Sequence, residues 1–81
     1  MDISKIPNSV WLNIVRGSSG FEPDFLAAKI LLSRLKLNVR QNPDTAPRCA
    51  EELKELFIRV AAHPKAQVDM QKIIQSIGSS L

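Results

Sequence analysis

The sequence predicts an all-α fold, a compact bundle of four helices that forms one domain over residues 1–81. Apolar residues recur at intervals of three and four, and tyrosine and alternating Val, Ile or Thr runs, which indicate strands, are absent from the sequence. Clusters of Pro, Gly and Asn divide the chain into segments of helix length. At 81 residues the chain suits a single domain with a thin core.

The expected helices span residues 9–16, 23–41, 46–62 and 64–77, and the first of them is short. Gly17 ends the first helix, since glycine suits the residue after a helix C-terminus. Pro23 opens the second and Pro47 lies in the first turn of the third, where no amide donor is needed. Pro64 ends the third helix and starts the fourth, which stops at Gly78.

The second helix carries two apolar strips rather than one. Its principal stripe has the spacing of three and four that is typical of a core-facing surface, and comprises Phe25, Ala28, Leu32, Leu35 and Val39. At about 100° per residue, Leu26, Ile30 and Leu37 lie on another side. This pattern predicts a central helix with neighbours on both sides, or a helix that is also used in a subunit contact.

Composition and charge exclude several classes of protein. The chain is 44% hydrophobic with a formal charge of +3, which is globular composition with a mild basic excess. Apolar runs stay well short of the roughly 18 residues of a membrane span, and the N-terminus has no signal-peptide pattern. A single cysteine fits a reducing compartment. We expect a cytoplasmic location and no membrane partner.

The residues that most often carry catalysis or metal binding are few. His63 is the only histidine and is expected to cap a helix junction. Cys49 continues an apolar stripe of the third helix, which favours core packing over a nucleophile. Glu51, Glu52 and Glu55 have basic neighbours and indicate a solvated face. We therefore predict no enzyme activity, catalytic residue, cofactor, metal or small-molecule substrate.

Four large apolar residues are the strongest functional signal, together with Trp11 on the first helix. The four do not all fit the principal stripes, and they are Leu12, Leu26, Ile30 and Leu37. Trp11 suits a core position and a partner contact equally well. The leading hypothesis is a non-enzymatic protein-interaction module, a regulator or adaptor that self-associates as a homodimer, with another protein as the other possible partner.

A basic stripe on the second helix supports an alternative hypothesis. Lys29, Lys36 and Arg40 lie between the two apolar strips, and phosphate backbones bind such stripes. No aromatic residue is interleaved with them to stack on bases. Nucleic-acid binding is therefore the second choice after protein interaction.

Overall fold

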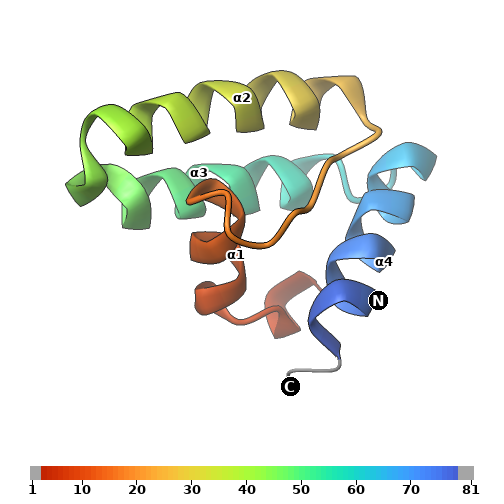
Figure 1. Cartoon of the computed structure of the whole chain (residues 1–81). Helices are drawn as coiled ribbons and strands as arrows, with labels where there is room; N and C mark the ends of the chain where they lie inside the picture. The colour runs from red at the N-terminus through yellow and green to blue at the C-terminus, as the bar shows by residue number, and fades with distance from the viewer. Residues whose placement is uncertain (1–2, 79–81) are drawn as a thin grey trace.

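The computed structural model describes residues 3–78 and confirms the all-α prediction, with no strand in this part of the chain (Figure 1). The four α-helices are α1 (Asn8–Val15), α2 (Leu26–Gln41), α3 (Ala46–Arg59) and α4 (Pro64–Gly78). Two short 3-10 helices, η1 (Ile3–Lys5) and η2 (Pro43–Thr45), precede α1 and α3.

The helices α2 and α3 form an antiparallel pair that lies along one side of the molecule (Figure 1). The helix α1 packs across α3 at a steep angle, and α4 turns away from the end of α3. The connection between α2 and α3 is a single 3-10 turn, so the two helices are held side by side. This arrangement buries one face of α2 and leaves the opposite face on the outside.

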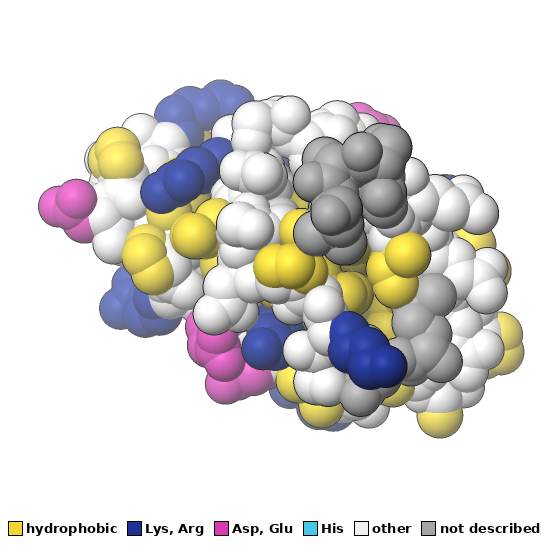
Figure 2. All heavy atoms as spheres, turned by 90° about the horizontal axis from the view of Figure 1, so that it is seen from below, with side chains coloured by type: hydrophobic (Ala, Val, Ile, Leu, Met, Phe, Trp, Pro, Cys, Tyr) yellow, Lys and Arg dark blue, Asp and Glu magenta, His cyan; other side chains and the backbone are white. Residues whose placement is uncertain are grey.

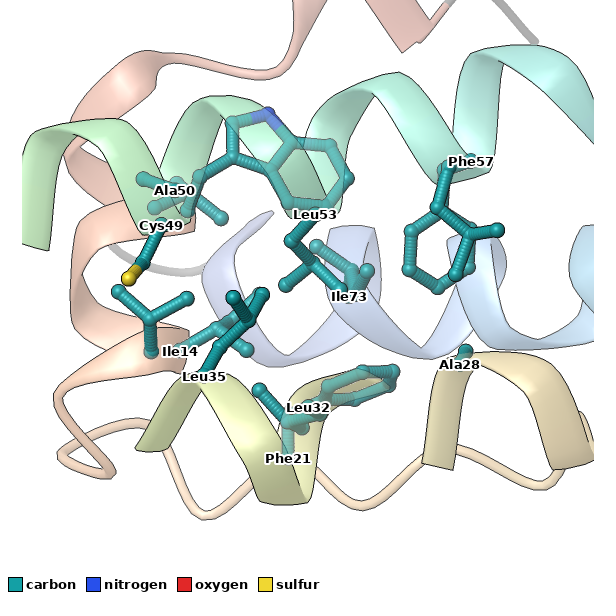
Figure 3. Close-up of a cluster of buried hydrophobic side chains, with 14 of the residues drawn as sticks. Ile14, Phe21, Ala28, Leu32, Leu35, Cys49, Ala50, Leu53, Phe57 and Ile73 are labelled. Atoms are coloured by element: carbon teal, nitrogen blue, oxygen red, sulfur yellow. The ribbon is translucent and has the colours of Figure 1, made fainter. Parts of the chain in front are cut away.

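The core lies where the four α-helices meet. Figure 3 shows Leu53 and Phe57 of α3 between side chains of α1, α2 and α4. The largest completely buried apolar side chains are Trp11, Ile14, Val15, Leu35, Leu53, Phe57 and Ile73. Burial of each such side chain contributes roughly 1.5–3 kcal/mol to folding, before the cost of ordering it is counted. These residues, and not local helix propensity, hold the short helices in place.

The start of α2 differs from the predicted boundary. The helix begins at Leu26 rather than at Pro23, because the backbone is still extended at Phe25 (φ −74°, ψ 122°). Phe21 and Pro23 are buried, so the segment before α2 packs as an extended strap instead of a first helical turn. Proline at the start of a helix is common, but it does not require the helix to begin there.

Other helix boundaries also differ from the prediction. The helix α3 ends at Arg59 rather than at residue 62, because Val60 leaves helical geometry (φ −105°, ψ 17°). The first helix runs over Asn8–Val15, one residue earlier than predicted at each end. Gly17 follows it with φ +78°, a conformation that favours glycine. The side chain of Ile77, predicted in the fourth apolar stripe, lies outside the described residues.

Candidate functional site

The outer face of α2 carries a line of exposed apolar residues, which we call the outer strip: Leu26, Ile30 and Leu37. Their side chains are 65%, 63% and 51% exposed. At about 100° per residue the strip lies opposite the buried side of α2, which includes Leu32 and Leu35. The prediction of neighbours on both sides is therefore wrong within residues 3–78, since only the inner side of α2 is packed.

The other two candidate partner residues belong with the core. Trp11 is 1% exposed, and its ring lies 5.6 Å from that of Phe57 between centroids. Its indole Nε1 is buried without a hydrogen-bond partner among the described residues. Leu12 is half-buried and packs against the core. Trp11 is therefore absent from the exposed surface, and Leu12 is only partly exposed on α1, so neither residue belongs to the outer strip.

Basic side chains flank the outer strip. Lys29, Lys36 and Arg40 lie along one edge of it, and Arg34 lies along the other. The helix α2 has these four basic residues and no acidic one. Removing four from the 11 basic residues of the chain leaves seven, against eight acidic residues. The positive excess of the whole protein thus resides on α2.

The side of the molecule away from α2 is different in character. Figure 2 views it from below and shows acidic and basic side chains together, with hydrophobic atoms in separate patches. Two further large apolar residues are exposed elsewhere, Ile58 on α3 (53%) and Val68 on α4 (47%). Each is an isolated residue of a kind common on protein surfaces. On the described surface, the outer strip is therefore the line of exposed large apolar residues along one helix, and the charged residues beside it on α2 are all basic.

A groove adjoins the outer strip between α2 and α3. Its volume is about 680 Å³, and it is lined by Ala27, Ile30, Leu31, Arg34, Glu52, Glu55, Leu56 and Arg59. The half-buried Leu31 and the buried Leu56 contribute apolar surface to it. Arg34 and Glu52 form an ion pair across it. Because Ile30 lines the groove and also belongs to the strip, the two features form one continuous surface.

A second hollow lies on the basic edge of α2. It measures about 340 Å³ and is lined by Val15, Arg16, Gly17, Lys36, Val39, Arg40 and Pro43. The C-terminal end of α1 thus brings Arg16 near two of the predicted basic residues. Lys29 lies further along α2, where it lines a separate hollow of about 240 Å³ together with Lys36. Lys29, Lys36 and Arg40 form a continuous basic edge on the surface.

The residues considered for catalysis are dispersed. His63 is exposed and its Nδ1 accepts a hydrogen bond from the Lys65 amide at 3.2 Å, which agrees with the predicted cap. Cys49 is 2% exposed, and its Sγ donates to Thr45 Oγ1 at 3.7 Å. It lies in the first turn of α3, whereas His63 lies beyond the last turn. Among residues 3–78 there is no group of three metal-binding side chains close enough to hold an ion.

One buried carboxylate was missed by the sequence prediction. Asp69 of α4 is completely buried, and its two oxygens accept hydrogen bonds from the amides of Asp24 (2.7 Å) and Phe25 (2.9 Å). These amides lie just before α2, so a side chain from α4 caps its N-terminus, where negative charge is favourable. The sequence does indicate that Asp69 is buried, because it falls on the same face of the helix as the apolar residues Ala66, Met70 and Ile73.

An exposed ion pair lies next to this cap. Lys72 of α4 donates a hydrogen bond to the carboxylate of Asp24. That hydrogen bond and the positive charge of Lys72 lower the pKa of Asp24 below 3.8, with smaller contributions from Lys29 and Lys65. The pair adds a second link between α4 and the start of α2.

We expect Lys72→Gln to raise the pKa of Asp24 toward 3.8, because the variant removes the hydrogen bond and the charge that lower it. The stabilisation from the lowered pKa is present above the unfolded-state pKa of about 3.9 and is lost as pH falls through the lower folded-state value. An NMR titration of the Asp24 side-chain carbon measures the shift. Lys54→Gln serves as the control, and equal Asp24 midpoints in wild type and Lys72→Gln would contradict the pairing.

Comparison with known proteins gives no relative, since no protein-family model, curated protein or solved structure matches this chain significantly. Within residues 3–78, every helix is too short or too polar to cross a lipid bilayer. The function must therefore be inferred from the residues on the surface of the molecule.

Proposed function

We propose that this chain is a non-enzymatic protein-interaction module, a regulator or adaptor that binds another protein through the outer face of α2. The observation that carries the proposal is the outer strip, in which Leu26, Ile30 and Leu37 are each more than half exposed. Exposed apolar side chains aligned on one helix face are typical of a surface that a partner covers. None of the three contributes to the core of the chain.

The charge of α2 favours a different protein over a second copy of this chain. A homodimer formed by two outer strips would bring two helices together that each carry four basic residues and no acidic residue. Like charges close to one another at an interface disfavour association. Self-association, the other form of the hypothesis, is therefore the weaker of the two.

Nucleic-acid binding is the second candidate function. It is favoured by the hollow in which Arg16 joins Lys36 and Arg40, next to Lys29 on the same edge. Neutralising phosphates with such a cluster gives binding that weakens steeply with salt. Salt-dependent binding of a DNA or RNA duplex, lost when Lys29, Lys36 and Arg40 are all changed to Gln, would establish this function.

Site-specific photo-crosslinking tests the protein-interaction proposal. A photoreactive amino acid replaces Ile30 in the full chain, which is expressed in cells of its natural source and irradiated. We expect a discrete protein adduct at this position, because a bound partner covers the outer strip. Mass spectrometry identifies the crosslinked protein.

The control places the same photoreactive residue at Ile58, which is also exposed and apolar but lies on α3 outside the groove. Adduct formation at position 30 should disappear when Leu26 and Leu37 are both changed to Asn, while circular dichroism shows an unchanged fold. The same adducts from both positions, or an adduct that survives the two Asn substitutions, would refute binding through the outer strip.

A further inference from the structure

We infer that the partner presents an acidic amphipathic helix, which lies along α2 with its apolar residues on the outer strip and its acidic residues against Lys29, Lys36 and Arg40. The inference rests on the proposed function and adds the chemistry of the partner. Two observations support it: all charged residues of α2 are basic, and a groove adjoins the outer strip.

The spacing of the outer strip matches a helical partner. Leu26, Ile30 and Leu37, with Ser33 between the last two, occupy positions separated by four, three and four residues. This is the seam spacing by which two helices pack along their length. Ser33 is exposed and small, so another helix can approach α2 closely near the middle of the seam. A partner helix of about four turns would cover the strip.

The charge of α2 selects an acidic partner. Apolar contact alone would not discriminate between partners, but a basic edge favours a helix with carboxylates along the facing edge. Lys29 and Arg40 are exposed and Lys36 is half-buried beside them, so their charges lie at the rim of the surface and not beneath it. Charges at such a rim mainly steer association and exclude partners of the wrong sign.

The two edges of the outer strip differ, so they predict different residues on the two flanks of the partner helix. The edge with Lys29, Lys36 and Arg40 is basic, whereas the opposite edge is the groove with its apolar floor. In that groove the charge of Arg34 is already paired with Glu52, and Glu55 lies near Arg59 along the α3 side. We therefore expect acidic residues on only one flank of the partner helix, and an apolar side chain on its other flank that fills the groove against Leu31 and Leu56.

Other occupants fit the surface less well. A phosphate backbone would use the basic edge but would leave three large apolar side chains in water between charges. An anionic membrane would accept the basic and apolar residues, but it has no side chain to fill the groove of about 680 Å³. A helix with a mixed apolar and acidic surface satisfies the strip, the basic edge and the groove together.

A peptide-binding experiment with the full chain tests this inference. The probe is a fluorescein-labelled synthetic peptide of about four turns, with Leu at positions i, i+4, i+7 and i+11 and Glu along one flank. A matched peptide carries Lys in place of each Glu. Fluorescence anisotropy should show the Glu peptide binding at least about tenfold more tightly, with an advantage that shrinks as salt rises.

Charge reversal provides the decisive comparison. In the variant Lys29→Glu with Arg40→Glu, the preference should invert so that the Lys peptide binds more tightly. Lys5→Glu with Lys54→Glu makes the same change in net charge away from the basic edge, and it should leave the preference for the Glu peptide in place. Ile30→Asn with Leu37→Asn should abolish binding of either peptide, while Ile58→Asn should not.

The outcomes separate this inference from the proposed function. If crosslinking at position 30 captures a partner but the Glu and Lys peptides bind equally, the protein-interaction function stands and the acidic helix is refuted. Binding to phosphatidylglycerol vesicles or to a DNA duplex through the same residues, with no preference between the peptides, would also refute it. An unchanged preference after Lys29 and Arg40 are reversed would show that these residues do not select the partner.

Discussion

Trp11→Ala should lower the free energy of unfolding by about 3–5 kcal/mol, the typical cost of emptying a buried aromatic position. The side chain is 1% exposed and packs on Phe57. An 81-residue domain has a total stability of roughly 4–12 kcal/mol, so the variant should lose a quarter or more of it. Urea denaturation followed by far-UV circular dichroism measures the loss, since the variant lacks the only tryptophan of the chain.

Trp11→Phe is the matched control for this experiment. It keeps an aromatic ring in contact with the core and removes the indole N–H, which has no partner among the described residues. Loss of an unsatisfied buried donor offsets part of the lost volume, so we expect a change of about 1 kcal/mol or less. If Trp11→Ala cost no more than this control, the indole would not be the core element that the structure shows.

Asp69→Ala should have the second largest effect, a loss of about 2–3 kcal/mol. The substitution leaves the partly buried amides of Asp24 and Phe25 without their acceptor and removes a negative charge from the N-terminus of α2. Chemical denaturation gives the change in stability. Hydrogen exchange at the Phe25 amide gives a local reading, since this amide should lose protection before the core amides do.

Asp69→Asn and Glu55→Ala complete the test of the cap. Asp69→Asn keeps one side-chain oxygen as an acceptor, so it should cost about 1–2 kcal/mol and protect one of the two amides only partly. Glu55 is an exposed acidic residue on α3, and its replacement by Ala should change stability by less than about 0.5 kcal/mol. Equal costs for all three variants would contradict a specific capping role for Asp69.

The fold was predictable because its determinants are local in the sequence. Apolar spacing identified all four helices, and Pro47, Pro64 and Gly17 marked three of their ends. The start of α2 was not predictable in this way. It is set by Asp69, whose bond to the Asp24 amide spans 45 positions along the chain, while Pro23 gave a misleading local signal.

The candidate site was only partly predictable for a similar reason. Helical spacing separated Leu26, Ile30 and Leu37 from the core stripe, but the sequence did not show whether a neighbouring helix of the same chain covers them. Trp11 could not be assigned, because an aromatic side chain of its size suits a core and an interface equally. The groove depends on how α2 and α3 lie against each other, which no local pattern encodes.

The Asp69 cap also has a consequence for the order of folding. Turns within α2 and α3, and the short connection between these helices, bring together residues that are near in sequence, so they close at little entropic cost. The Asp69 bonds instead close a loop of more than 40 residues and require α4 to have docked. On a ribosome, where synthesis runs from the N-terminus, the two amides just before α2 therefore lack their acceptor until α4 has emerged. The start of the outer strip, at Leu26, is thus fixed only when the C-terminal helix is in place.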